Sequence, residues 1–245
     1  MMQGMHTFGE RIICATSTRA DGNMDFRFDD PRDVKAHRDQ FLSQLGISYA
    51  LHFAMRCTHG DTVLVVGRES DGFGANAQSE QPIADACITQ SPDIALFLLT
   101  ADCIPLSLFD PHTGTIALIH GSRKTICEGL LEKTITLMQK QCSVDPASLC
   151  AHLGPHIRKE SYSFPLPLSL VHPALSPYVE EREGRAFIDL TSFCINELLH
   201  AGIDRSMITE SPDDTGSDDT YFSHHRAQKR NMPEARIGTV LMRMP

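Results

Sequence analysis

Basic residues are scarce in this 245-residue sequence, which has 22 Lys and Arg against 31 Asp and Glu and a formal net charge of −9. Nucleic acids and anionic membranes bind to basic faces, so this balance argues against both as partners. A small anionic substrate remains compatible with it, because a few arginines in one pocket can oppose the overall charge. We therefore expect a small-molecule substrate.

Long apolar runs and paired cysteines are also absent. No stretch approaches the about 18 apolar residues of a transmembrane helix, and residues 1–10 lack the apolar segment of a signal peptide. None of the eight cysteines has Cys-x-x-Cys spacing, and free thiols are typical of a reducing compartment. The sequence therefore predicts a cytoplasmic protein and leaves its oligomeric state open.

Glycine-rich phosphate loops are missing as well, since neither Gly-x-Gly-x-x-Gly nor Gly-x-x-x-x-Gly-Lys-Ser/Thr occurs. This absence argues against the common nucleotide-binding folds. At about 150 residues per domain, the length allows one large domain or two small ones. Apolar runs of strand length alternate with helical patterns without a regular βαβ order, which favours an α+β fold with a mixed sheet.

The expected elements follow from apolar periodicity and from the turn residues between them. We expect three helices: one that begins at Pro31, one over 125–141 and one over 191–201. We expect strands at 12–17, 62–66, 94–99, 104–109, 115–120, 149–153 and 237–242. Asp110 to Gly114 have turn-forming residues and predict a hairpin between strands 104–109 and 115–120.

This hairpin predicts a pair of reactive side chains. Its second strand ends at His120, and its first strand begins just after Asp102-Cys103, so the outer ends of the two strands should bring His120 close to Cys103. One interpretation is a nucleophilic cysteine activated by histidine. Another is a metal site with His59 as third ligand, in which Zn²⁺ or copper would keep an open fourth position. The spacing alone is also compatible with a buried cysteine and an incidental histidine.

Other charged residues give weaker signals. Arg19, Arg38, Arg123 and Arg226 are candidate anion binders, although solvated surface arginines would look the same in the sequence. With 12 histidines in the chain, some clustering is expected without function.

A specific family resemblance lies in Thr100-Ala101-Asp102-Cys103-Ile104-Pro105-Leu106 followed by Ile119-His120. This pattern resembles the YfiH family of laccase-domain proteins, long labelled multicopper polyphenol oxidases. Weaker matches follow in order along nearly the whole chain: Ser17-Thr18-Arg19, Asp29-Asp30-Pro31, His37-Arg38, Thr58-His59-Gly60, Ala84-Asp85-Ala86, Asp110-Pro111, Leu153-Gly154-Pro155-His156-Ile157, Asp189-Leu190 and Phe222-Ser223-His224-His225-Arg226.

The resemblance implies one α+β domain over residues 1–245, with mixed β-sandwich layers flanked by helices. It implies one zinc ion held by His59, Cys103 and His120. It also implies phosphorolysis of adenosine, inosine, guanosine and methylthioadenosine to base and ribose 1-phosphate, and deamination of adenosine. A role in editing peptidoglycan precursors is a further implication, and the oxidase label implies copper.

Roles within the site follow from this implied chemistry. Cys103 and Asp102 are the expected catalytic residues, with Asp102 orienting a ligand or a proton. Arg19, Arg38 or Arg226 would bind phosphate. The sequence departs from the family at Gly121-Ser122-Arg123-Lys124-Thr125, where the family reads Ala-Gly-Trp-Arg-Gly, and at His225, where it has arginine.

These departures keep two further hypotheses open beside the purine enzyme and the copper oxidase. One is a metal-free Cys-His hydrolase that edits peptidoglycan precursors. The other is a zinc-bearing binding protein whose catalysis has been altered.

Overall fold

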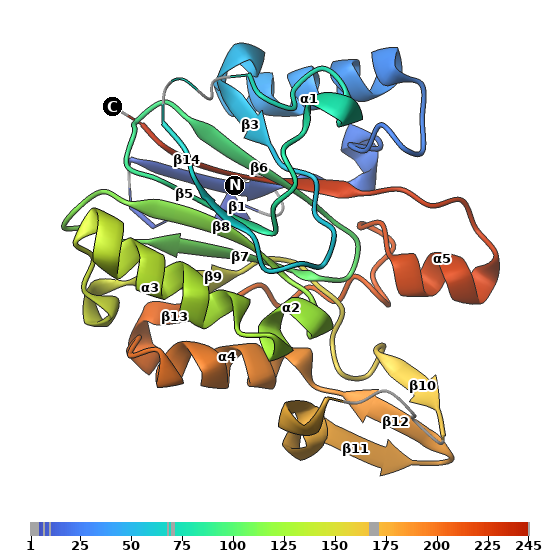
Figure 1. Cartoon of the computed structure of the whole chain (residues 1–245). Helices are drawn as coiled ribbons and strands as arrows, with labels where there is room; N and C mark the ends of the chain where they lie inside the picture. Colours follow the sequence, from blue (N-terminus) through green and yellow to red (C-terminus); the bar gives the residue numbers. More distant parts are fainter. Residues whose placement is uncertain are drawn as a thin grey trace.

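Two β-sheets stacked face to face form the centre of the fold (Figure 1). The computed structural model describes residues 5–6, 8–9, 11–67, 69, 72–166 and 172–244, so the prediction for residues 1–10 falls largely outside them. In spatial order, the first sheet contains β1 (Met5–His6), β2 (Ile12–Thr16), β14 (Ile237–Arg243), β6 (Ala95–Thr100) and β3 (His52–Ala54). The second contains β13 (Ile208–Glu210), β9 (Cys150–Leu153), β7 (Ile104–Phe109), β8 (Ile116–Gly121), β5 (Ala86–Thr89) and β4 (Val63–Val65).

A third, small sheet lies apart from the sandwich, beyond the N-terminal end of α4 (Leu190–His200) (Figure 1). Its order is β10 (Ser163–Pro165), β12 (Arg185–Ile188) and β11 (Val179–Arg182). Short 3₁₀ turns occur at Arg19–Asp21, Tyr49–Leu51, Gln78–Glu80, Pro146–Ser148, Pro173–Tyr178 and Arg205–Met207.

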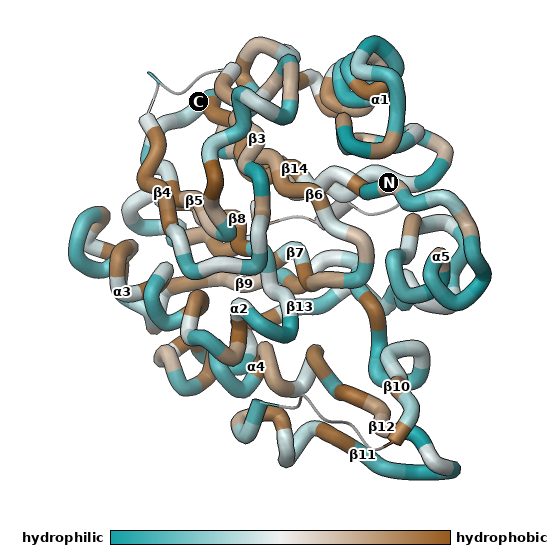
Figure 2. The backbone as a smooth tube through the Cα atoms, turned by 45° about the vertical axis from the view of Figure 1, so that its right-hand side comes forward, coloured by the Kyte–Doolittle hydropathy of each residue, from teal (hydrophilic) through white to brown (hydrophobic). Residues whose placement is uncertain are grey.

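The sandwich is held by apolar side chains of the two sheets that meet between them. Cys14, Leu96 and Leu241 of the first sheet pack with Cys87 and Leu118 of the second, and all are buried. Figure 2 shows the same distribution, with hydrophobic segments concentrated on the central strands and a mostly hydrophilic α5 (His224–Arg230). Burial of this apolar surface is the main favourable contribution to the fold.

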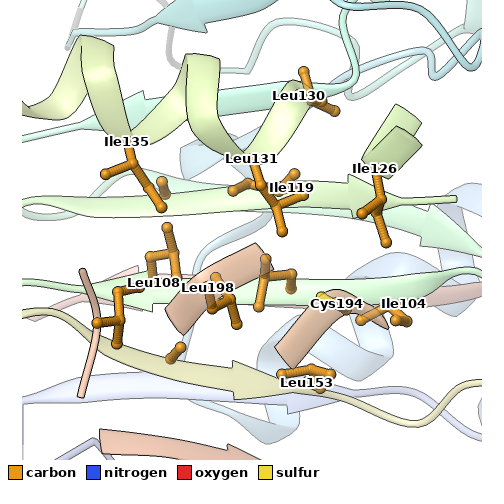
Figure 3. Packing of buried hydrophobic residues seen from close by; sticks show 14 of the residues in the cluster. Ile104, Leu108, Ile119, Ile126, Leu130, Leu131, Ile135, Leu153, Cys194 and Leu198 are labelled. Carbon is orange, nitrogen blue, oxygen red and sulfur yellow. The ribbon is translucent and has the colours of Figure 1, made fainter. Parts of the chain in front are cut away.

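Helices cover the two outer faces of the sandwich. On the first sheet lies α1 (Pro31–Gln44), which starts where the Asp30 carboxylate accepts the Arg32 N–H and Pro31 fixes the first turn. On the second sheet lie α2 (Arg123–Cys127), α3 (Leu130–Cys142) and α4. Figure 3 shows Leu131 and Ile135 of α3 and Leu198 of α4 packed over the strands.

These layers confirm the expected α+β class with mixed sheets, because parallel and antiparallel pairs occur in both large sheets. The expected helix at 125–141 is wrong in one respect: it is two helices. Gly129 adopts a φ of 80°, a left-handed conformation that glycine accepts readily, and this turn separates α2 from α3.

A single domain over residues 1–245 remains a prediction. Within the described ranges, no helix combines the length and the apolar character needed to cross a bilayer.

A candidate metal centre at one end of the sandwich

Cys103 lies where the chain passes from one sheet to the other. It follows β6 of the first sheet and directly precedes β7 of the second. The preceding residue, Asp102, has a φ of 86°, a conformation in which aspartate is tolerated better than most residues. Its backbone C=O accepts the Ile157 N–H at 3.0 Å, which ties this tight crossover to the segment after β9.

His120 reaches Cys103 through the register of the predicted hairpin. Strands β7 and β8 pair antiparallel, with Ile104 opposite Gly121 and Pro105 opposite His120. The expected proximity of the two strand ends is confirmed. The ligand atoms of His59, Cys103 and His120 all lie within 4.8 Å of one another, and the rings of His59 and His120 meet edge to face with centroids 4.8 Å apart.

Asp85 organises this group from behind. His120 Nδ1 donates to Asp85 Oδ1 at 2.8 Å, and the same carboxylate accepts the backbone N–H groups of Thr58, His59 and Gly60 at 3.2, 3.0 and 2.8 Å. Because the Nδ1 proton is held by the carboxylate, His120 Nε2 is the ring atom left to bind a metal. One buried side chain thus orients one histidine and fixes the loop that carries the other.

Sequence reasoning missed this role of Asp85. The residue lies directly before β5, a strand that was not predicted, and the pairing of β5 with β8 brings Asp85 beside His120. The family match at Ala84-Asp85-Ala86 was the available signal, but it carried no role.

The charges of these groups are strongly coupled. Burial raises the pKa of the Cys103 thiol, but His120 and His59 outweigh this effect and lower it from 9.0 to about 6. Burial lowers the pKa of His120, but the nearby Cys57, Cys103 and Asp85 raise it well above 6.5. The site therefore favours a thiolate at Cys103, the form of cysteine that binds metals and attacks electrophiles.

The three residues fit a transition-metal ion on chemical grounds. Two imidazoles and one thiolate are donors that zinc and copper accept. A carboxylate behind a ligating histidine is the usual supporting partner of such a site. Three protein ligands leave one position open, as in catalytic rather than structural zinc centres.

Two cavities of about 420 Å³ each share His59 and Cys103. The first, here called the substrate cavity, is also lined by Asp102, Arg123 and Lys124, and by aromatic residues from the small sheet and α5. The second extends from Cys57 to Arg27 and Arg236. Their volumes are in the range of small-molecule sites.

Arg123, a candidate anion binder, lies in the substrate cavity, whereas the three arginines expected to bind phosphate do not line either cavity at the metal centre. Arg38 is fully buried, donates to the Met24 C=O at 2.8 Å, and stacks on Phe26 and Phe97. Arg19 is exposed and stacks on Phe222.

Arg226 is also buried and acts as a donor to the backbone. Its guanidinium donates to the C=O groups of Thr215 and Asp218, at 3.0 and 2.8 Å, and to that of Tyr221. With Arg19 it lines a separate cavity of about 410 Å³.

Asp102 lines the substrate cavity, but its carboxylate is already engaged. Its two oxygens accept the Thr215 hydroxyl at 2.7 Å and the backbone N–H of His225 at 2.6 Å. The structure thus shows Asp102 connecting the crossover turn to the first turn of α5.

Comparisons with known proteins identify the family to which the chain is similar. A family model described as multi-copper polyphenol oxidoreductase laccase matches residues 9–242. A Streptomyces coelicolor protein named purine nucleoside phosphorylase is 30% identical over 201 residues, which cover 81% of this chain and 79% of that protein. A Deinococcus radiodurans protein of the same name is 32% identical over 187 residues, covering 72% of this chain and 70% of the relative.

Solved structures show the same fold. YlmD from Geobacillus stearothermophilus superimposes with a TM-score of 0.90 at 22% identity, covering 100% of this chain and 98% of that one. The hypothetical protein YfiH of Bacillus licheniformis gives a TM-score of 0.86 at 19% identity, covering 98% and 99%. Together with the match over residues 9–242, these findings show that the chain belongs to the laccase-like YfiH family.

Proposed function

We propose that this protein is a zinc-dependent purine nucleoside phosphorylase, which converts a purine nucleoside and phosphate into the free base and ribose 1-phosphate. The observation that carries the proposal is the His59–Cys103–His120 group, placed on a cavity with two basic side chains. The names of the Streptomyces and Deinococcus relatives support the reaction class.

His59, Cys103 and His120 would hold the zinc ion, and Asp85 would orient His120. A zinc ion bound there supplies a Lewis acid that polarises an oxygen of the substrate. Two imidazoles with one thiolate also suit copper, which the family description names. We choose zinc because the open three-ligand arrangement matches catalytic zinc sites.

We assign phosphate binding to Arg123 and Lys124 in preference to Arg19, Arg38 and Arg226. Arg123 is half-buried and Lys124 is exposed, so both retain donors for an anion, and both line the cavity that contains Cys103. Arg226 donates to backbone carbonyls, and Arg38 is fully buried and lines neither cavity at the metal centre. Arg19 faces the separate cavity beside Phe222.

Asp102 acts in this proposal as a positioning residue. Its two carboxylate contacts fix the start of α5 against the cavity. Deamination of adenosine is proposed as a second reaction in the same cavity, in which water adds to C6 of the base and the 6-amino group leaves as ammonia, giving inosine. The eight cysteines are free, which supports the reducing cytoplasm as the compartment.

One observation favours a second candidate function. The Cys103 thiol, with a pKa of about 6 beside His120, has the features of an activated nucleophile. A metal-free Cys-His hydrolase acting on peptidoglycan precursors would use this pair directly. Zinc content separates the two, because a thiolate engaged by tightly bound zinc is not free to attack.

The test of phosphorolysis is product analysis with inosine, adenosine and methylthioadenosine, each with and without phosphate. We expect free base and ribose 1-phosphate only when phosphate is present, and none from Cys103→Ala. Base release that does not depend on phosphate would contradict the proposal, and so would full activity in Cys103→Ala. Protein that binds zinc but converts none of these nucleosides would instead support a zinc-bearing binding protein.

A further inference from the structure

Three rings from two distant parts of the sequence meet at the wall of the substrate cavity. Tyr162 precedes β10, Phe164 lies within it, and His225 belongs to the first turn of α5. Their centroids are 5.0 Å apart for Tyr162–Phe164, 6.0 Å for Tyr162–His225 and 5.5 Å for Phe164–His225, all edge to face. Each ring therefore contacts the other two, and all three line the cavity that contains Cys103.

The position of His225 is fixed through its backbone. Its N–H donates to the Asp102 carboxylate at 2.6 Å, and the Ser223 hydroxyl accepts the next N–H, that of Arg226, at 3.1 Å. The Ser223 bond caps the first turn of α5, and the Asp102 bond holds this turn against the crossover turn that carries Cys103. The His225 ring is thereby placed on the same cavity as the metal-ligand group.

His225 also has an unsatisfied atom. Its Nε2 is buried and has no hydrogen-bond partner among the described residues. A buried polar atom without a partner is unfavourable, so a water, an ion or a ligand is needed to satisfy it. Burial lowers the pKa of His225, so its ring is neutral near pH 7 and can donate from one nitrogen while accepting at the other.

We propose that Tyr162, Phe164 and His225 form the subsite for the heterocyclic base of the substrate, with His225 Nε2 as its hydrogen-bond partner. This inference rests on the proposed function and adds the location and chemistry of base recognition. Heterocyclic bases stack on phenylalanine, tyrosine and histidine rings and offer ring nitrogens and exocyclic groups at their edges.

A planar cation borders the three rings, since the Arg123 guanidinium lies 5.4 Å from the Phe164 centroid. Arg123 and Lys124 thus lie on the same cavity as the ring cluster, so an anion and an aromatic base can bind side by side in one cavity.

The test is calorimetric binding of hypoxanthine and adenine to the purified protein in buffer without phosphate, so that no turnover occurs. The variants are Phe164→Leu, His225→Ala and His225→Gln, with Phe187→Leu as the matched control. Phe187 lies on β12 of the same small sheet, where it pairs with Ser163 of β10. It is outside the lining of the substrate cavity.

We expect Phe164→Leu to weaken hypoxanthine binding by about tenfold or more, because one stacking ring is lost. His225→Ala should have a similar effect. His225→Gln should restore part of the affinity, since its amide can occupy the position of Nε2. Phe187→Leu should bind like the wild type, and all four variants should retain wild-type zinc content.

Two outcomes would overturn the inference: no binding of either base by the wild type, or wild-type affinity in both Phe164→Leu and His225→Ala. Failure of phosphorolysis gives a different result. If the bases bind through these rings but inosine releases none, the subsite stands and the proposed reaction fails. If inosine is cleaved with an unchanged KM in the variants, the reaction stands and the subsite fails.

Discussion

The end of the sandwich that carries the metal-ligand group differs from the region where Arg38 and Arg226 lie. The ligand atoms of His59, Cys103 and His120 lie within 4.8 Å of one another, and His59 and Cys103 line both cavities at the metal centre. Arg38 and Arg226 are equally buried, but Arg38 donates to the Met24 C=O and stacks on Phe26 and Phe97, and Arg226 donates to three backbone C=O groups. The convergence of several ligand atoms beside a cavity, and not burial alone, therefore distinguishes the candidate site.

Removal of the metal from the His59–Cys103–His120 group should have the largest effect on activity and on stability. Treatment with a chelator should abolish phosphorolysis, and added zinc should restore it whereas copper should not. If zinc saturates the site at about 1,000 times its Kd, its removal should also lower the free energy of unfolding by about 4 kcal/mol. Activity assays and thermal unfolding check both results. Full activity after exhaustive chelation would show that Cys103 works without a metal.

Substitution of the supporting carboxylate should have the next largest effect. Asp85→Asn should weaken zinc binding by about 10–100-fold, because the amide orients His120 less well than the carboxylate does. Competition with a chromophoric chelator measures this affinity.

Asp110→Asn is the matched control, since Asp110 is another buried carboxylate, held by Thr113 and Ser148 in the hairpin turn at the other end of β7. Equal zinc affinities in the two variants would mean that Asp85 only stabilises the fold.

The buried His156, which lies outside the metal-ligand group, should make the stability of the fold depend on pH. His156 is fully buried, its Nδ1 bonds the Gly154 C=O, and its Nε2 bonds the Thr191 hydroxyl. Burial, with a contribution from Arg158, lowers its pKa from 6.5 to about 4.

The unfolded chain then binds a proton that the folded chain does not, so stability falls as the pH decreases from 6.5 towards 4. The loss should be about 3 kcal/mol at the lower end. Urea unfolding across this range should show a shallower decline in His156→Gln. His112→Gln, which changes an exposed histidine of the hairpin turn, should decline like the wild type. An unchanged slope in His156→Gln would contradict this assignment.

The smallest expected effects distinguish Arg226, which donates to backbone carbonyls, from Arg123, which lines the substrate cavity. Arg226→Met should lower the free energy of unfolding by about 2 kcal/mol, because several buried carbonyls lose their donor. Arg123→Met should change stability by less than about 0.5 kcal/mol but should raise the KM for phosphate by about tenfold. Chemical unfolding and initial-rate kinetics give the two quantities. A reversal of this pattern would move phosphate binding back to Arg226.

The sequence was most informative where neighbouring strands determine geometry. The hairpin turn at Asp110–Gly114 fixes the register of β7 and β8, and this register alone places His120 beside the residue that precedes Ile104. Strand lengths and a turn were enough to predict the Cys103–His120 proximity, because no other part of the chain is needed to form it.

The remainder of the site depends on long-range packing. Asp85 acts through β5, a strand of four residues that has no alternating pattern because it is buried on both faces. Tyr162 and Phe164 meet His225 across a long stretch of sequence, and the bond from the His225 N–H to Asp102 fixes the start of α5. Arg38 and Arg226 look like surface arginines in the sequence, since their burial is decided by backbone carbonyls that only the folded chain brings around the guanidinium.

The proposed zinc-dependent function depends most directly on what His59, Cys103 and His120 bind. The decisive measurement is therefore the metal content of the purified protein by elemental analysis. We predict one zinc ion per chain in the wild type, no copper, and loss of the zinc in both Cys103→Ala and His59→Ala. Wild-type protein without zinc, or with copper in its place, would contradict the account. Retention of zinc by Cys103→Ala would likewise show that the ion is held elsewhere.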